Sequence, residues 1–322
     1  MKRSEAFKGY LSVAGAALLW AFSGIAGKYL FMTGIEPIEL VQLRVLIASA
    51  VLFIIFASSS RPLLKIGKPD ILSFLILGGG IMSVLQLSYF IAVAHIQVAA
   101  AIVLQYLAPV LVAVFSMAFW KERCTPAKIA ALILSFAGCY LAAGGYGLSF
   151  RNMNTQGLFW GLCSACFFAA YTLLAERMTY RYSPWTVLFY SLLFAGVSIS
   201  IASGFPDAAA HGRSFEQWLL IVYIAVFGTL LPYGLFTVGV SFIRSTRAVI
   251  TATLEPISAA VLASFMISEL LSALQVVGGV FVIAAVVVLQ LSREHGELSP
   301  ASIRSRSGSP GFRSASVEDL SG

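Results

Sequence analysis

Long apolar runs recur along the whole chain, and they constrain its fold more than any other feature of the sequence. Each run has about 20 residues, which is the length that a helix needs to cross the hydrocarbon core of a bilayer. Short polar breaks separate the runs, so neighbouring helices are expected to be antiparallel. The ten runs cover residues 10–30, 37–57, 71–94, 98–120, 125–143, 155–176, 183–203, 215–242, 246–267 and 272–291.

The composition excludes an ordinary soluble enzyme. Of the 322 residues, 59% are hydrophobic and only 11% are charged, whereas a soluble domain carries about 25% charged residues. The runs are too long for the strands of a β-barrel and lack their apolar–polar alternation. The sequence therefore predicts an all-α polytopic membrane protein with ten transmembrane helices.

Other patterns in the sequence do not indicate a cofactor or a metal. Cys163 and Cys166 share one helix face, but a metal site needs about four ligands, so small buried residues are the simpler interpretation. No Walker sequence is present, so ATP is not the expected energy source. The first apolar run is too long for the core of a cleaved signal peptide, and further spans follow it.

Basic residues follow a membrane topology and do not indicate a nucleic-acid surface. The net charge is +7, and seventeen of the 21 Lys and Arg residues fall in the termini and in the breaks on the same side as the termini. Lys28, Arg151 and Arg213 fall on the other side, and Arg44 lies within a span. Cytoplasmic loops are rich in Lys and Arg. The asymmetry therefore predicts an inner or plasma membrane protein with both termini in the cytoplasm.

The character of the sequence changes after Leu291. Residues 293–322 are rich in Ser, Gly and Arg and poor in apolar residues. Such a segment cannot bury enough apolar surface to order itself. A disordered cytoplasmic tail is therefore expected, with a regulatory or binding segment as the alternative.

An internal repeat relates the two halves of the chain. Three pairs of residues are each 147 residues apart, namely Pro37 and Pro184, Pro109 and Pro256, and Glu122 and Glu269. Because each copy has five spans, an odd number, the second copy must have the opposite orientation in the membrane. Inverted repeats are typical of secondary transporters, in which two halves move around a site near the midplane. The repeats are expected to cover residues 1–145 and 146–292.

Several segments resemble the drug/metabolite transporter superfamily, and within it the ten-helix EamA-type transporters. The resemblance covers about residues 8–292 and implies a carrier of small molecules without indicating which one or in which direction. Its residues are "LLWAFSGIAGK" in the first run, the arginine of "VQLRVLIAS", "AAIVLQYLAPVLVAVFSMAFWKE" around the fourth run and "AVITATLEPISAAVLASFMISELL" around the ninth.

Glu255 is a charged residue in the middle of an apolar run. It lies about ten residues into the ninth run, roughly 15 Å deep at 1.5 Å per residue. A charge at the centre of a bilayer costs about 2.5 to 3.5 kcal/mol on insertion scales. This carboxylate is therefore a candidate for binding substrate or for carrying a proton. The alternative is a structural role, in a buried ion pair or in hydrogen bonds to backbone groups.

Arg44 is a second charged residue that lies well inside a span. It lies about seven residues from the outer end of the second run, which is about 10 Å along a helix. Three interpretations are open: Arg44 snorkels outward to the interface, forms a pair with Glu255, or attracts an anionic group of the substrate.

Three prolines predict kinks within the spans. Pro109, Pro232 and Pro256 each lack an N–H, which frees the carbonyl four residues earlier. The freed carbonyls are those of Gln105, Gly228 and Ala252. Freed carbonyls at mid-depth are one way to build a polar site within lipid, and plain packing kinks are the alternative. Gln105 and Tyr106 lie beside the first kink and are candidates for the substrate pathway.

The resemblance also implies a central cavity, lined mainly by the first, third, fourth, sixth, eighth and ninth helices. Polar and aromatic residues in these runs are further candidates for the substrate pathway. They are Trp20, Gln86, Tyr89, Tyr171 and Tyr233. For each of them, core packing or a place in the interfacial belt is the alternative.

Together these features predict a secondary carrier that exports small polar metabolites of the amino-acid type by alternating access, driven by the proton gradient. Facilitated diffusion, and uptake of a nucleotide-like, vitamin or cofactor compound, are the alternatives. An enzyme is not expected, because the spans hold one central carboxylate and no central histidine, and a channel suits inverted halves less well. The expected partners are a small-molecule substrate, the bilayer and a proton, and a homodimer is left open.

Overall fold

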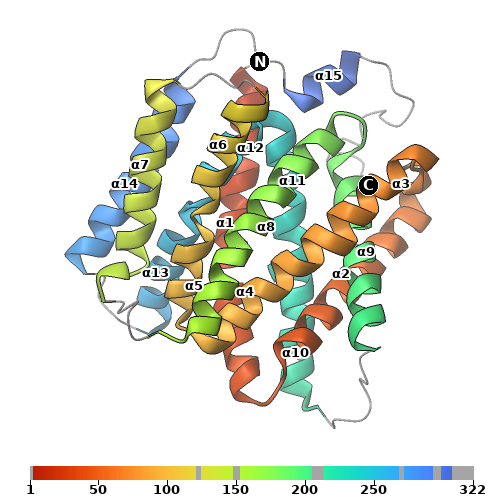
Figure 1. Ribbon diagram of the computed structural model, residues 1–322, viewed down its shortest axis with the longest axis horizontal. Coiled ribbons are helices and arrows are strands. Elements are labelled where there is room, and N and C mark those ends of the chain that lie inside the picture. Colours follow the sequence, from red (N-terminus) through yellow and green to blue (C-terminus); the bar gives the residue numbers. More distant parts are fainter. Residues whose placement is uncertain are drawn as a thin grey trace.

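A computed structural model shows the chain as a bundle of helices (Figure 1). The structure describes residues 3–120, 125–147, 153–204, 213–267, 272–292 and 299–306, and these residues form helices and no strand. Within these ranges, eight helical stretches are long and apolar enough to cross a membrane. They are Glu5–Met32, Pro37–Ser59, Lys68–His95, Val98–Trp120, Thr155–Thr179, Pro184–Ser203, Phe215–Ile243 and Ala273–Leu291. The protein is thus an all-α polytopic membrane protein.

Two of the ten expected spans differ from the other eight. The helix α7 (Pro126–Ala142) is apolar but shorter. Residues 246–267 contain two short helices, α12 (Ser245–Ala252) and α13 (Leu254–Ile267), which are separated by Thr253. Pro256 explains this break, because it has no N–H to donate to the carbonyl of Ala252. Ten crossings of the membrane remain a prediction.

In the first half, the first two spans are continuous helices and the next two are interrupted in a similar way. Its first two helices are α1 (Arg3–Met32) and α2 (Pro37–Ser59). Its third span consists of α3 (Ile71–Leu75), a π-helical segment (Ile76–Met82) and α4 (Ser83–His95). The fourth is divided into α5 (Val98–Gln105) and α6 (Ala108–Trp120), just before Pro109.

The second half has the same order of elements. It begins with α8 (Thr155–Thr179) and α9 (Pro184–Ser203). Its third span is again interrupted by a π-helical segment (Val226–Leu230), which joins α10 (Phe215–Ala225) to α11 (Leu231–Ile243). After α12 and α13 the bundle ends with α14 (Ala273–Leu291). Since π-helical segments often mark functional sites, the matching pair draws attention to the space between them.

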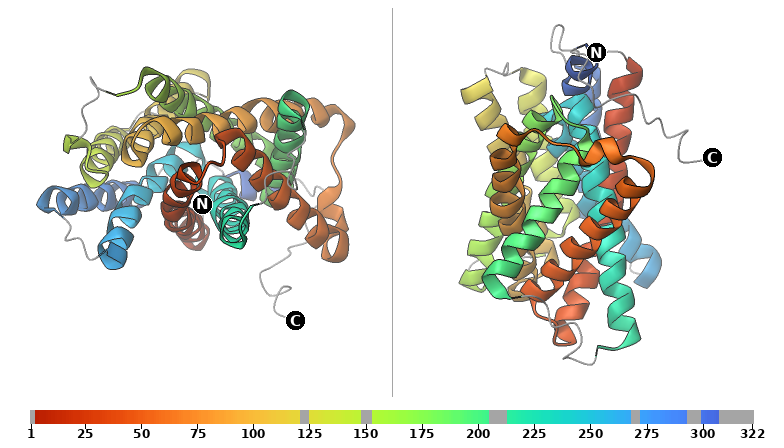
Figure 2. Two further views of the ribbon diagram at one scale, coloured as in Figure 1. Left: turned by 90° about the horizontal axis from the view of Figure 1, so that it is seen from below. Right: turned by 90° about the vertical axis from the view of Figure 1, so that its right-hand side faces the viewer.

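The two halves pack against each other reciprocally. The first helix of each half lies along the third span of the other, α1 along α11 and α8 along α4. The second helices, α2 and α9, also pair, and the last helices, α7 and α14, form a pair at one edge of the bundle (Figures 1 and 2). Gly138 and Gly278 permit this close approach, because a Cβ at Gly138 would lie 2.8 Å from the carbonyl oxygen of Gly278.

Polar contacts tie helices at both ends of the bundle. At one end, the ammonium group of Lys28 on α1 donates to the carbonyls of Val93 (2.7 Å) and Ala94 (3.1 Å) on α4. At the other end, Glu176 on α8 accepts hydrogen bonds from Arg244 (3.0 Å) and from the backbone N–H of Ser245 (2.7 Å). These contacts come near the last turns of α1 and α8, so the two first helices run in opposite directions.

A short helix follows the bundle, in the segment whose composition predicts disorder. The helix α15 (Pro300–Arg306) packs on α8 and α11, at the same end of the bundle as the start of α1 (Figure 1). Arg304 is buried and donates to the carbonyls of Thr179 and Tyr182. The last carbonyls of a helix have no partner within the helix, and Arg304 supplies donors to this region. Burial lowers the pKa of Arg304 to about 10, which leaves the guanidinium charged at neutral pH.

The expectation of a disordered tail therefore does not hold for residues 299–306. Residues 293–298 and 307–322 lie outside the described residues, as do Glu122 and Glu269 of the internal repeat.

Candidate functional site

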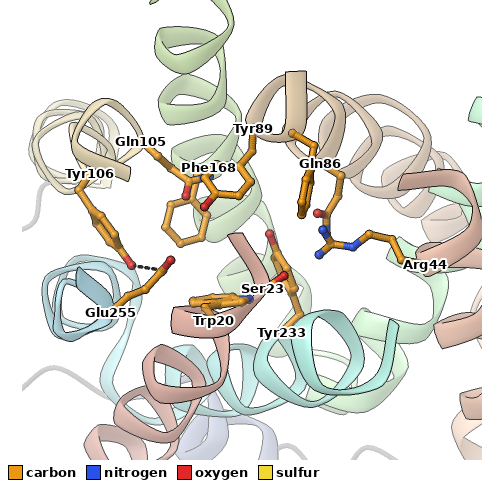
Figure 3. A pocket seen from close by; sticks show the side chains of 11 residues that line it. Trp20, Ser23, Arg44, Gln86, Tyr89, Gln105, Tyr106, Phe168, Tyr233 and Glu255 are labelled. Carbon is orange, nitrogen blue, oxygen red and sulfur yellow. Dashed lines mark hydrogen bonds between the residues drawn. The ribbon is translucent and has the colours of Figure 1, made fainter. Parts of the chain in front are cut away.

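A cavity lies between the two halves of the bundle (Figure 3). The cavity has a volume of about 30 Å³. The cavity is therefore narrow in this conformation. Its lining residues are Trp20, Ser23, Arg44, Gln86, Tyr89, Phe90, Gln105, Tyr106, Phe168, Tyr233 and Glu255.

Eight of the nine residues predicted for the substrate pathway lie in this lining. The exception is Tyr171, whose ring contacts that of Tyr233 at 5.7 Å and whose hydroxyl is 3.1 Å from the hydroxyl of Thr237. Tyr171 thus packs against the cavity residue Tyr233 without lining the cavity itself. The roles of all nine in transport remain predictions.

Three lining residues were missed by the sequence reasoning: Ser23, Phe90 and Phe168. Helical spacing could have found two of them. Ser23 follows Trp20 by three residues and Phe90 follows Gln86 by four, and residues at these spacings share one helix face. Phe168 offered no polar signal that separates it from the other aromatic residues of its span.

Arg44 forms one end of the cavity. The residue is 2% exposed, and its Nε donates to the hydroxyl of Thr229 at 2.7 Å. One terminal nitrogen, Nη2, is 3.3 Å from the carbonyl of Gly228. The other, Nη1, is buried and has no hydrogen-bond partner among the residues that the structure describes. The carbon of the guanidinium lies 4.5 Å from the centre of the Phe90 ring. Arg44 therefore does not snorkel outward, and it forms no ion pair with Glu255.

The partners of Arg44 are available because of the local backbone of the eighth span. Pro232 cannot bond the carbonyl of Gly228, so this carbonyl is free to accept from Arg44. Thr229 lies in the same π-helical segment and donates its hydroxyl proton to the carbonyl of Ile224 at 2.8 Å. Its oxygen is thereby oriented to accept from Arg44. A side chain of the first half is thus held by a hydroxyl and a freed carbonyl of the second half.

Glu255 forms the other end of the cavity, together with Tyr106. The hydroxyl of Tyr106 lies 2.7 Å from Oε2 of Glu255 and 2.7 Å from the carbonyl of Ala252. Pro256 frees that carbonyl, as the sequence predicts. Here too a side chain of the first half reaches a freed carbonyl of the second.

The proton count at Tyr106 links this contact to the charge of Glu255. A phenol has one proton to donate, so it can satisfy either the carboxylate or the Ala252 carbonyl, but not both. A protonated Glu255 can donate to the oxygen of Tyr106, and Tyr106 can then donate to Ala252. The arrangement therefore accommodates Glu255 in both its charged and its neutral form.

Aromatic side chains fill the middle of the cavity between these two ends. The ring of Trp20 meets that of Tyr233 at 5.0 Å and that of Phe168 at 6.0 Å, both edge to face. Ser23, Gln105 and Tyr89 add polar atoms nearby (Figure 3). Among the described residues, no group of three or more His, Cys, Asp or Glu side chains is placed to hold a metal ion.

The sequence matches the EamA-like transporter family over residues 7–144 and 155–291. The chain therefore belongs to this family of membrane transporters. A solved crystal structure has the same fold, with a TM-score of 0.71 at 20% identity, covering 89% of this chain and 96% of that one.

Individual relatives are also transporters. The chain is 27% identical over 291 residues to the uncharacterised inner membrane transporter YicL of Salmonella typhimurium, covering 88% of this chain and 95% of YicL. It is 30% identical over 224 residues to an uncharacterised transporter of Archaeoglobus fulgidus, covering 69% and 77%. It is 25% identical over 257 residues to the pseudopaline exporter CntI of Pseudomonas aeruginosa, covering 80% and 87%. These similarities and the apolar helices indicate a multi-pass protein of the inner membrane.

Proposed function

We propose that this protein exports small polar metabolites of the amino-acid type by alternating access, with a proton as the coupling ion. The observation that carries the proposal is the cavity between the two halves, where a buried guanidinium with one unpartnered nitrogen and a carboxyl group line the same narrow space. Secondary carriers bind their substrates in such positions. The similarity to an exporter supports the direction of transport.

The ties at the two ends of the bundle are the parts that we expect to move. We expect the helix ends around the Lys28 contacts to form the outer gate and those around the Glu176 contacts to form the inner gate. The first set of contacts lies within residues 1–145 and the second within residues 146–292, the two inverted halves. The cavity is narrow in this conformation, and we expect a substrate to enter it when one gate opens.

Glu255 is the group that would carry the proton. Because Tyr106 can bond both the charged and the neutral carboxyl group, Glu255 can gain a proton when the cavity faces outside and lose it when the cavity faces the cytoplasm. Export then follows if substrate occupies the cavity only during the outward movement.

Transport by purified protein in lipid vesicles tests this proposal. With an imposed pH gradient, an exchange of substrate for protons accumulates an amino-acid-type substrate on the acidic side, and a protonophore abolishes the accumulation. Accumulation on the alkaline side would instead indicate uptake together with protons, and equilibration without accumulation would indicate facilitated diffusion. The mass of the protein in detergent decides whether it is a homodimer.

The orientation of the chain can be tested separately. The basic loops support cytoplasmic termini. In a variant without the native cysteines, Asn154→Cys should react with a membrane-impermeant thiol reagent on intact cells, and Lys68→Cys should not. The opposite labelling would contradict this topology.

A further inference from the structure

The two charged side chains of the cavity lie at its opposite ends and do not contact each other. In Figure 3, Arg44 lies beside Gln86 at one end and Glu255 beside Tyr106 at the other, with the side chains of Trp20, Ser23, Phe168 and Tyr233 between them. The narrow space thus has a cationic end, a largely aromatic middle and an acidic end.

The cationic end lacks an anion. Arg44 is held on one side by Thr229 and Gly228, both neutral acceptors, and its Nη1 is buried without a partner. A buried charge without a counter-ion is costly, and a carboxylate is the group that complements a guanidinium best. The rigid hold on Nε and Nη2 leaves Nη1 to bond a ligand.

The acidic end offers the complementary interaction. Tyr106 contacts Oε2 of Glu255 and leaves the rest of the carboxyl group to the cavity. Among the residues that line this space, Arg44 is the only basic one, and it is at the far end. A charged Glu255 therefore has no counter-ion in the cavity, and an ammonium group would supply one.

Building on the proposed function, we propose that the substrate is a slender zwitterion whose carboxylate and ammonium group are separated by several bonds. The carboxylate binds Arg44, the ammonium group binds Glu255, and the chain between them lies against Trp20 and Phe168. In a compact α-amino acid the carboxylate and the ammonium group are attached to the same carbon atom. These two groups therefore cannot reach Arg44 and Glu255 at the same time. The narrowness of the cavity favours an unbranched chain over a branched one.

A series of ω-amino acids of increasing length tests this inference. Glycine, 4-aminobutanoate, 5-aminopentanoate and 6-aminohexanoate share the same two charges and differ only in the distance between them. We expect affinity for the purified protein, measured by calorimetry or by thermal shift, to rise at least about tenfold from glycine to the best member. The unbranched monoacid and monoamine of that length should both bind more weakly than the matching amino acid.

Two variants test which end of the cavity binds which charged group of the substrate. Arg44→Gln should abolish the advantage of the amino acid over the monoamine, and Glu255→Gln should abolish its advantage over the monoacid. The inference is overturned if glycine binds as well as the longer members, or if both variants retain the wild-type preferences. Where a variant does not fold, the length series on the wild-type protein still decides.

The experiment also separates this inference from the proposed function. If compact α-amino acids are bound tightly and moved by a pH gradient, the proposed export function is supported, and the proposal of a substrate with widely separated charges is wrong. If vesicles accumulate no amino-acid-type compound of any length, the proposed function itself fails.

Discussion

The two halves of the bundle have the same order of helices but contribute differently to the cavity. Four pairs of positions, each 147 residues apart, show the difference: Arg44 and Ser191, Tyr106 and Thr253, Leu85 and Pro232, and Ala108 and Glu255. In each pair one residue lines the cavity or, like Pro232, leaves a carbonyl group free to bond a cavity residue. The other residue of the pair does neither.

Hydrogen bonds show how the counterparts differ. Ser191 donates to the carbonyl of Val187 in its own helix at 2.7 Å, and Thr253 donates to that of Ile250 at 2.6 Å. Arg44 and Tyr106 instead reach across to the other half. In these contacts the first half supplies the donors. The second half supplies the acceptors, which are the hydroxyl of Thr229, the carbonyls of Gly228 and Ala252, and the carboxyl group of Glu255. The two halves thus share the order of their helices but not the polar residues of the cavity.

The largest effect is expected from Glu255→Gln, which retains the shape of the side chain and removes its titration. Accumulation driven by a pH gradient should fall to background, while exchange of substrate across the membrane continues. Flux in vesicles with and without the gradient measures both. Glu216→Gln, at an exposed carboxylate outside the cavity, is the control and should behave like the wild type. Intact proton-driven accumulation in Glu255→Gln would refute the coupling role.

The second-largest effect is expected from Arg44→Gln, compared with Ser191→Ala at the corresponding position. Loss of a buried charged partner costs about 2 to 5 kcal/mol, so binding of an anionic substrate should weaken by at least about 30-fold. Ser191→Ala removes a hydrogen bond within one helix and should change binding by less than about threefold. Equal losses of substrate affinity in the two variants would mean that the two halves contribute equally to substrate binding.

A smaller effect is expected from Tyr106→Phe, which retains the ring and removes the hydroxyl that can donate either to Glu255 or to the carbonyl of Ala252. An unsatisfied buried group costs about 1 to 3 kcal/mol, so we expect proton-coupled flux to fall by about tenfold. The pH dependence of flux should also change, because Tyr106 contacts the carboxyl group. Thr253→Val, at the corresponding position, should leave the pH dependence as it is. A wild-type pH profile in Tyr106→Phe would exclude this role.

Much of the fold could be predicted from the sequence for physical reasons, whereas part of the cavity lining was predicted from the resemblance to a known family. Runs of about 20 apolar residues have few alternatives to spanning helices. Arg44 and Glu255 were recognisable because charges are rare at such depths. Their partners were not predictable. Thr229 is 185 residues from Arg44, and the pair depends on how the two halves pack rather than on any local pattern.

The smallest effect on transport is expected from Arg304→Ala, in the helix that composition did not predict. Arg304 gives its hydrogen bonds to two carbonyls beyond the cavity, at the end of α8 and in the loop after it. Removing them should cost about 1 to 3 kcal/mol, or roughly 2 to 10 °C in melting temperature for a chain of this size. Flux per folded molecule should remain within about twofold of the wild type, because Arg304 touches neither Glu255 nor Arg44. Deleting residues 299–322 should reproduce this result, and thermal unfolding and vesicle flux measured on the same preparations can compare the two changes. If either change instead alters flux at unchanged stability, α15 acts on the inner gate, and the tail belongs to the transport cycle rather than to the stability of the fold.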